Sequence, residues 1–305
     1  MALSILRPGM LTTVQDMGRW GFQSRGVPAS GALDWYSHRL ANRLLGNDAA
    51  MATLEVTLMG PHIRFDSDTT FVITGAEFHV TLDDAPIGMN RVTQARAHAI
   101  LKMGDRLRGA RAYIAVAGGI DVPEVLGSRS THVLTGMGGL DGRSLRPGDV
   151  LRIGARGKGQ GAITPHPLPF TPLIPFAPGH ARLRAVPADK RLATHIVSQR
   201  FRVSPQSNRM GYRLEGTRVA ETPTGELIST AVPTGAIQVP PMGQPILLMH
   251  DHATTGGYAI AATVITADLP LAGQLAPGDW VEFEACSIDA ARTALRAREA
   301  MLDAA

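Results

Sequence analysis

Four polar segments of the sequence are rich in the residue types that hold oxyanions and carboxylates. They are residues 12–19, residues 118–131, residues 202–212 and residues 251–258. Each combines hydroxyl or guanidinium side chains with glycine, whose backbone N–H can approach a ligand closely. An arginine guanidinium is planar and permanently charged, which suits a carboxylate or a phosphate. A single segment of this kind is also typical of an ordinary turn, but four in a chain with only 18% charged residues favour a binding site.

Common catalytic signatures are absent from the sequence. It has no Gly-x-Ser-x-Gly elbow, no Walker A loop and no His-Glu-x-x-His motif, and the glycines at residues 136–142 lack dinucleotide-binding spacing. No segment resembles Ala-Met-Lys-Met, so we expect no biotin on this chain. His250 and His252 flank Asp251 and could share one face of a strand, as two metal ligands would. Since no third ligand is close in sequence, we predict no metal and a pair of partly exposed histidines.

Composition excludes several other classes of protein. The formal charge is +4, but lysine and arginine are dispersed and not clustered with aromatic residues, so we predict no nucleic-acid binding. One cysteine, Cys286, excludes an internal disulfide framework and suits a reducing compartment. No apolar run approaches the roughly 18–20 residues that span a bilayer, so we predict a cytoplasmic protein with no membrane segment.

The elements that must position the polar segments are mostly strands. Residues 78–83 alternate apolar and polar side chains, as a half-buried strand requires, whereas residues 112–117 and 246–249 are apolar runs that predict strands buried on both faces. Gly-Asp pairs at 104–105, 148–149 and 278–279 predict tight reversals before strands. The last two belong to a Pro-Gly-Asp pattern repeated about 130 residues apart, which favours two halves of like architecture.

Few helices are expected. Residues 33–44 carry an apolar stripe at helical spacing, with Ser30 and Gly46 as cap candidates, and residues 288–304 form a second helix that Ser287 could cap. Residues 157–179 are rich in proline and glycine, which prevents regular sheet or helix. We therefore predict a mainly β chain with a first β-barrel subdomain at 1–155, a linker at 156–180 and a second barrel with a C-terminal helix at 181–305.

The same polar segments resemble the KipA family, also called allophanate hydrolase subunit 2, whose members include the PxpC-like components of 5-oxoprolinase. The similarity covers nearly the whole chain. The motifs that carry it are Thr13-Val14-Gln15-Asp16-x-Gly18-Arg19, Gly118-Gly119-Ile120-Asp121-Val122-Pro123, Gly127-Ser128-Arg129-Ser130-Thr131, Ser207 to Tyr212, Gln238-Val239-Pro240-Pro241 and Thr254-Thr255-Gly256-Gly257-Tyr258.

The resemblance implies two cyclophilin-like β-barrel subdomains and a complex with two partner proteins, one KipI-like and one LamB/YcsF-like. That complex would use ATP, at a site that could be shared with a partner, to open 5-oxoproline or a related lactam or amide to glutamate. Two alternatives stay open. One is a biotin-dependent carboxyltransferase component similar to that of urea carboxylase, and the other is a non-catalytic regulator that binds a kinase inhibitor.

The resemblance also implies a site in the groove between the two subdomains. Residues that suit proton transfer, water orientation or oxyanion stabilisation there are Asp16, Asp251, Thr254 and Thr255. Residues that suit binding of substrate or anion are Gln15, Arg19, Arg129, Ser130, Thr131, Ser207, Asn208, Arg209, Tyr212, Gln238, Gly256, Gly257 and Tyr258. We expect Arg129→Ala or Arg209→Ala to abolish turnover and leave the fold intact.

One loop departs from the family pattern. Relatives commonly read Asp-Arg-Gln-Thr-Thr-Gly-Gly-Tyr-Pro-Lys, whereas this chain has His252 and Ala253 in place of Arg-Gln, and Ala259 and Ile260 in place of Pro-Lys. The loop thereby loses a guanidinium, an amide and an ammonium group. This change predicts altered anion binding and keeps a different amide or carboxylated substrate as an alternative.

Overall fold

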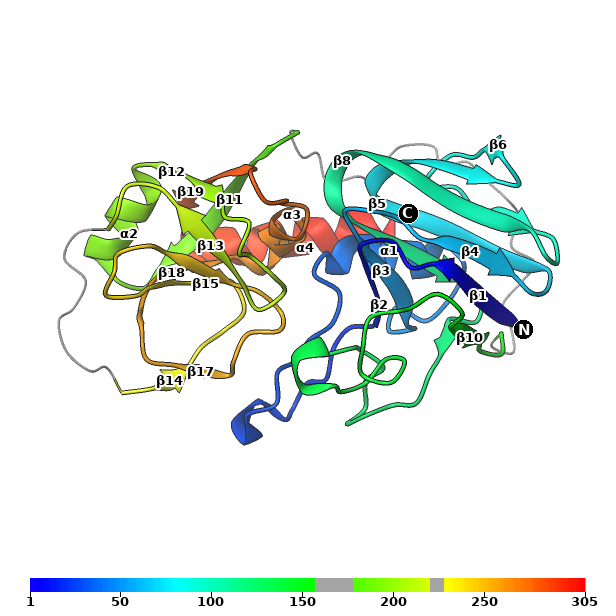
Figure 1. Ribbon diagram of the computed structural model, residues 1–305. Coiled ribbons are helices and arrows are strands. Elements are labelled where there is room, and N and C mark those ends of the chain that lie inside the picture. The colour runs from blue at the N-terminus through cyan, green and yellow to red at the C-terminus, as the bar shows by residue number, and fades with distance from the viewer. Residues whose placement is uncertain (157–177, 220–227, 305) are drawn as a thin grey trace. The chain divides into compact units, whose positions relative to one another are not determined.

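The protein has two barrel-like sheets and few helices, which confirms the predicted mainly β class (Figure 1). The computed structural model describes residues 1–156, 178–219 and 228–304. The chain divides into two compact units: the first comprises residues 1–19, 30–173 and 302–305, and the second comprises residues 20–29 and 174–301. Residues 20–29 thus group with the second unit, although they precede most of the first in sequence. Most of the predicted linker, residues 157–177, lies outside the described residues.

The first unit contains a ten-stranded sheet with β5 and β8 as its longest strands (Figure 1). Its strands are β1 (Ala2–Arg7), β2 (Leu11–Gln15), β3 (Thr53–Thr57), β4 (His62–Phe65), β5 (Thr69–Leu82), β6 (Ala85–Pro86), β7 (Thr93–Ala95), β8 (Ile100–Val116), β9 (Ile120–Asp121) and β10 (Val150–Ile153). Apolar side chains from these strands form one core, in which the rings of Phe65 and Phe71 stack with centroids 4.9 Å apart. The predicted reversal at Gly104-Asp105 is wrong, because both residues lie inside β8. Its pairing with β5 instead shifts register around them.

Seven strands of the second unit close into a barrel in the order β11-β18-β15-β16-β13-β12-β19. The strands described in this unit are β11 (His180–Pro187), β12 (Arg200–Val203), β13 (Gly211–Glu215), β14 (Thr230–Ala231), β15 (Ala236–Val239), β16 (Ile246–Leu248), β17 (Thr255–Gly256), β18 (Ala259–Val264) and β19 (Trp280–Ala285). Tyr212 and Leu247 are buried, and because successive side chains of a strand alternate in direction, their neighbours face outward. Ile246 and Leu248 are therefore only partly buried, which corrects the prediction that this strand is buried on both faces.

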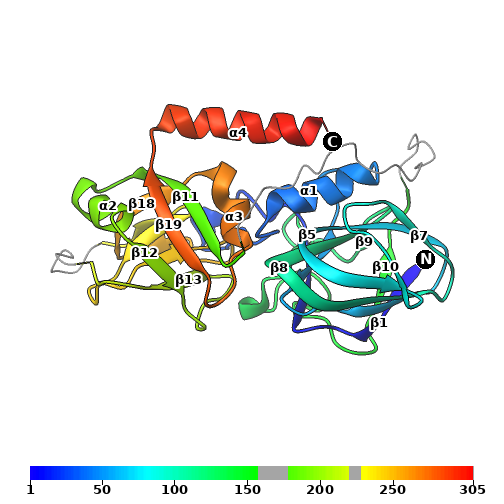
Figure 2. The ribbon, with the colours of Figure 1, turned by 90° about the horizontal axis from the view of Figure 1, so that it is seen from above.

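In the described part of the chain, four α-helices accompany the sheets: α1 (Trp35–Leu44), α2 (Lys190–Val197), α3 (Leu269–Gly273) and α4 (Ile288–Asp303). Helix α1 packs against β5 and β8 (Figure 2) and confirms the predicted helix, but its N-cap is Asp34, whose carboxylate accepts a hydrogen bond from the Ser37 N–H at 2.9 Å. Ser30, the expected cap, instead has a left-handed φ of 55°. Helix α4 also matches its prediction, with the Ser287 hydroxyl accepting from the Ala290 N–H. The short α2 and α3 were not predicted.

No helix among the described residues is both long and apolar enough to cross a membrane.

Candidate functional site

In the first unit, the predicted site residues meet around one carboxylate, that of Asp16, which directly follows β2. This carboxylate accepts hydrogen bonds from the Gly18 N–H at 2.8 Å, the Ser128 hydroxyl at 2.7 Å, the Arg129 N–H and the Ser130 hydroxyl. The Ser130 oxygen in turn accepts from the Asp16 N–H. We call residues 15–19 together with residues 128–131 the Asp16 cluster. Its carboxylate joins two segments that lie more than a hundred residues apart in sequence.

Both arginines of the Asp16 cluster bind neighbouring groups of the same unit. Arg19 is 1% exposed, and its guanidinium donates to the carbonyl oxygens of Ser130 and Val125. Arg129 donates through Nε to the Val122 carbonyl at 2.9 Å and through Nη1 to the Glu124 carboxylate at 2.6 Å. The guanidinium groups predicted to hold an anion are therefore engaged in connections within the protein.

Gln15 and Thr131 complete the cluster. The Gln15 Nε2 donates to the Thr131 carbonyl at 3.1 Å, and the Thr131 hydroxyl donates to the Val14 carbonyl at 2.9 Å. A glycine is needed at Gly138, where an added Cβ would lie 2.1 Å from the Ser130 carbonyl oxygen, at a backbone φ of +68°. The cluster thus functions as a tightly packed connection in which most polar groups satisfy one another.

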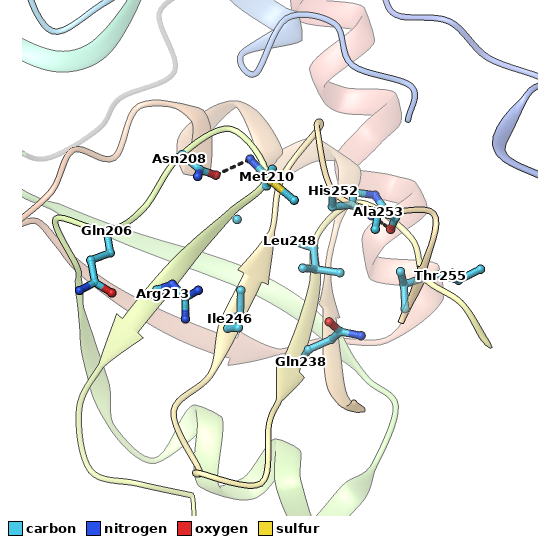
Figure 3. Close-up of a pocket in the computed structure, with 12 residues that line it drawn as sticks. Gln206, Asn208, Met210, Arg213, Gln238, Ile246, Leu248, His252, Ala253 and Thr255 are labelled. Atoms are coloured by element: carbon cyan, nitrogen blue, oxygen red, sulfur yellow. Dashed lines mark hydrogen bonds between the residues drawn. The ribbon is translucent and has the colours of Figure 1, made fainter. Parts of the chain in front are cut away.

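In the second unit, a cavity of about 240 Å³ lies on the outer face of the barrel (Figure 3). Its floor is apolar, with Ile246 and Leu248 of β16 at the centre. The polar side chains around that floor come from β13, β15, β17 and the loops beside them: Gln206, Asn208, Arg213, Gln238, His252 and Thr255. We call this the barrel-face cavity. An apolar surface with a few polar groups at its rim is the usual form of a small-molecule site.

The loop before β13 forms one wall of the barrel-face cavity. The Asn208 side-chain oxygen accepts from the Met210 N–H at 2.8 Å, and the Ser207 hydroxyl oxygen accepts from the Arg213 N–H at 3.1 Å. These bonds stabilise the turn between β12 and β13. Asn208, one of the predicted site residues, lines the cavity, whereas Tyr212 points into the barrel interior and is 2% exposed.

Arg209 and Asp251 form a buried ion pair behind this wall. The Arg209 guanidinium donates through Nε to one carboxylate oxygen at 2.9 Å and through Nη2 to the other at 3.1 Å. The Asp251 N–H also donates to the Arg209 carbonyl at 2.9 Å. These contacts tie the loop before β13 to the loop after β16, so each of these two predicted site residues has the other as its partner.

His250 and His252 are both buried, contrary to the prediction of partial exposure. The His252 Nδ1 lies 2.6 Å from the Ala253 carbonyl oxygen, which can only accept, so this nitrogen carries the proton. The Nε2 lies 3.1 Å from the Thr234 hydroxyl, and burial lowers the pKa of the imidazole below its usual range. His252 therefore presents a neutral ring to the cavity.

Among the described residues, no three His, Cys, Asp or Glu side chains gather to hold a metal.

Gln238 forms the far side of the barrel-face cavity, and Gly256 of β17 lies against its amide. Gln238 is 5% exposed, and its Nε2 finds no hydrogen-bond acceptor in the parts of the chain that the structure describes. An added Cβ at Gly256 would lie 2.5 Å from this Nε2, so glycine lets β17 approach the amide. Of the neighbouring predicted residues, Thr255 lines the cavity, while Thr254 is buried, Gly257 is half-buried and Tyr258 is 48% exposed, and these three do not line it.

The sequence-based prediction missed Arg213, Gln206, Ile246 and Leu248. A signal existed for Arg213, since it stands between Tyr212 and Leu214 in an alternating strand and must therefore face outward. Arg19 and Arg129 belong to the first unit, and Asn208 and Thr255 to the second. That these four share one groove stays a prediction.

Known proteins are similar to nearly the whole chain. The family model for the carboxyltransferase domain, subdomain A and B, matches residues 25–285. The chain is 40% identical to the C subunit of 5-oxoprolinase from Escherichia coli, over 97% of this chain and 94% of that protein. It is 34% identical to urea amidolyase of Saccharomyces cerevisiae, but spans 17% of that protein. The crystal structure of Kluyveromyces lactis urea carboxylase superposes with a TM-score of 0.90 at 32% identity, over 99% of this chain and 29% of that one. The chain therefore belongs to the family of carboxyltransferase domains, subdomain A and B.

Proposed function

We propose that this chain is a component of an ATP-dependent 5-oxoprolinase-type complex that hydrolyses 5-oxoproline, or a closely related lactam, to glutamate. The observation that supports this most is the 40% identity to the E. coli 5-oxoprolinase protein, which extends over almost all of both chains. A second relative of the same name, from Haemophilus influenzae, is 36% identical over 99% of this chain and 96% of its own length. Similarity between whole chains supports a shared role better than similarity to one module of a larger enzyme.

The reaction needs ATP because a lactam is an amide. The resonance that gives the C–N bond its ~18–20 kcal/mol rotation barrier also resists attack by water. Transfer of a phosphoryl group from ATP to the lactam oxygen removes that resonance and releases ADP. One water then adds to the carbon, the C–N bond breaks as the nitrogen takes a proton, and a second water releases phosphate from the new carboxyl group.

The barrel-face cavity supports a role for this chain in holding the lactam. Its volume, about 240 Å³, is below the roughly 300–1,000 Å³ of sites for drug-sized ligands, so it suits a single small metabolite. A lactam together with ATP would need more space. We therefore expect the ATP site to involve one of the two partners, the KipI-like or the LamB/YcsF-like protein.

Reconstitution tests this function. The chain is purified and combined with the KipI-like and LamB/YcsF-like proteins of the same genome, and glutamate and ADP are measured with 5-oxoproline as substrate. We expect equal release of both products, and only when all three proteins and ATP are present. Absence of turnover from a complex that assembles on a sizing column would contradict the proposal and favour the regulatory role.

A second candidate function is biotin-dependent carboxyl transfer. The TM-score of 0.90 to K. lactis urea carboxylase favours it, as does the match to a carboxyltransferase model. In that case, product formation would depend on bicarbonate and on a biotinylated carrier protein, and avidin would stop it. Under the 5-oxoprolinase proposal, avidin has no effect on glutamate release, so one inhibitor distinguishes the two.

A further inference from the structure

Three residues on neighbouring strands form a row across the barrel-face cavity. Arg213 of β13 pairs with Ile246 of β16, and Ile246 pairs on its other side with Gln238 of β15. Adjacent strands are about 4.8 Å apart, so the backbones of Arg213 and Gln238 lie about 10 Å apart with Ile246 between them. Figure 3 shows the Arg213 side chain and the Gln238 carboxamide on either side of Ile246. Leu248, one row further along the same face, extends the apolar surface.

The two ends of this row carry hydrogen-bonding groups with no partner in the described protein. Among the residues that the structure describes, the exposed Arg213 guanidinium makes no hydrogen bond or ion pair, although Arg19, Arg129 and Arg209 all do. The Gln238 Nε2 is buried, also with no acceptor in the described chain. A buried donor without an acceptor is unfavourable, and a ligand that supplies the acceptor removes this penalty.

The charge of the cavity also limits the ligand. Arg213 is the one formally charged side chain among the described lining residues, because His252 is held neutral by burial. A single positive charge complements a monoanion. It suits a polyphosphate less well, and it gives no particular advantage to a neutral molecule such as urea.

We propose that the barrel-face cavity recognises a lactam that bears one carboxylate, with Arg213 as the carboxylate ligand and Gln238 as the lactam ligand. In a small-ring lactam the amide is cis, so its N–H and C=O point to the same side. A primary carboxamide offers a donor and an acceptor side by side, and pairs with such an amide through two hydrogen bonds. The ring then lies over Ile246 and Leu248. This inference rests on the proposed function and names the group of the substrate that each side chain binds.

Binding to the purified chain tests the assignment through three ligands measured by calorimetry. These are 5-oxoproline, 2-pyrrolidinone, which has the same lactam but no carboxylate, and urea. We expect 5-oxoproline to bind the wild-type chain most tightly, by roughly tenfold or more over 2-pyrrolidinone, because a charge-assisted contact is lost in the latter. Failure of 5-oxoproline to bind, or equal affinity for the two lactams, would overturn the inference.

Two variants test the contributions of Arg213 and Gln238 to binding separately. In Arg213→Gln we expect the affinity for 5-oxoproline to fall to the level of 2-pyrrolidinone, whose own affinity stays unchanged. In Gln238→Met we expect both lactams to bind more weakly. Arg202→Gln serves as the matched control, since Arg202 lies on the neighbouring strand β12 and does not line the cavity, and it should leave all affinities unchanged. An equal loss for both lactams in Arg213→Gln would contradict the assignment.

The same measurements distinguish failure of the inference from failure of the proposed function. If the reconstituted complex releases glutamate but Arg213→Gln does not alter the binding of 5-oxoproline, the function stands and the assignment of Arg213 is wrong. If the binding pattern holds but no complex releases glutamate, the cavity is a carboxy-lactam site and the proposed 5-oxoprolinase role is wrong.

Discussion

The Asp16 cluster and the barrel-face cavity are made of the same residue types, yet they differ in how their polar groups are used. In the Asp16 cluster, one carboxylate accepts four hydrogen bonds, and the guanidinium groups of Arg19 and Arg129 bind carbonyls and a carboxylate of the same unit. In the cavity, the guanidinium of Arg213 and the amide nitrogen of Gln238 make no such bonds within the described residues. The buried Gln15 Oε1 of the cluster also has no donor among the described residues, so the two regions differ in how their charged groups are paired: the cluster's carboxylate and arginines bind within the protein, whereas the Arg213 guanidinium does not.

The largest expected effect separates two arginines of the second unit. Arg209→Ala should lower the free energy of unfolding by about 3–5 kcal/mol, because it leaves the buried Asp251 carboxylate without its partner. Arg213→Ala, in the strand that follows the Arg209 loop, should change it by less than about 0.5 kcal/mol. Urea denaturation followed by tryptophan fluorescence measures both. This revises the expectation that Arg209→Ala leaves the fold intact.

The double variant Arg209→Met/Asp251→Leu provides the control for this pair. Replacing both partners removes the unpaired charge, so much of the stability lost in Arg209→Ala should return. Equal destabilisation by Arg209→Ala and Arg213→Ala would show that the Arg209–Asp251 ion pair does not contribute more to stability than the Arg213 side chain does.

The next effect concerns Asp16 and Thr255, both predicted as catalytic residues. Asp16→Ala should lower the free energy of unfolding by about 3 kcal/mol or more, because several buried donors lose an acceptor and each unsatisfied group costs about 1–3 kcal/mol. Thr255→Ala should change it by less than about 0.5 kcal/mol, since this residue is exposed at the cavity rim. Denaturation of the two variants side by side provides the measurement. A stable Asp16→Ala protein would show that the cluster does not hold its two segments together.

A pH-dependent effect is expected in the first unit from His38 of α1. This side chain is fully buried, and burial lowers its pKa from 6.5 to about 4. Between these values the unfolded chain binds a proton that the folded chain does not, so stability falls as the pH drops from 6.5 to 4. The loss should approach about 3 kcal/mol, at 1.36 kcal/mol per unit of pKa difference.

Chemical denaturation at pH 7 and pH 4 measures this loss, and His38→Asn is the matched variant because it cannot take up the proton. The variant should show a smaller fall in stability over that range than the wild type. The same fall in both proteins would assign the acid sensitivity to other groups.

A small effect on stability, but a clear one on binding, is expected from Gly256. An alanine Cβ there would lie 2.5 Å from the Gln238 Nε2, the far end of a flexible side chain that can move away. Gly256→Ala should therefore cost less than about 1 kcal/mol in stability and weaken the binding of 5-oxoproline measured by calorimetry. Gly88→Ala is the control, because nothing lies within 4 Å of its added Cβ. Unchanged binding of 5-oxoproline in Gly256→Ala would show that Gln238 does not contact the ligand.

Much of the fold follows from local sequence patterns. The helices at residues 35–44 and 288–303 are predicted from apolar spacing, and the strands around residues 78–83 and 112–117 from alternation or an apolar run. The pattern fails at Gly104-Asp105, where β8 continues because β5 pairs with it before and after these residues, at Met103 and Arg106. Helix α2 was not predicted, although Asp189 caps it and Leu192, Ala193 and Ile196 are buried on one face.

The site could be predicted only in part. Three of the predicted residues, Asn208, Gln238 and Thr255, line the barrel-face cavity, but Arg213 was not among the predicted residues. It lies one residue beyond the motif that ends at Tyr212, so a search confined to motif residues could not find it. Conversely, Arg129 was predicted to bind an anion. In the structure it forms an ion pair with Glu124, and the short sequence distance of five residues did not reveal this pair.

Residue order alone establishes that the chain is mainly β and belongs with the relatives that share its polar motifs, because periodicity and motifs are properties of that order. Which polar side chains have hydrogen-bonding groups to spare depends instead on the folded neighbourhood. Hydrogen-bond partners such as Asp16 with Ser130, or Arg209 with Asp251, come from segments far apart along the chain. The three-dimensional surroundings of a guanidinium decide whether it is already paired within the protein or can bind a ligand. The residue type alone does not reveal this.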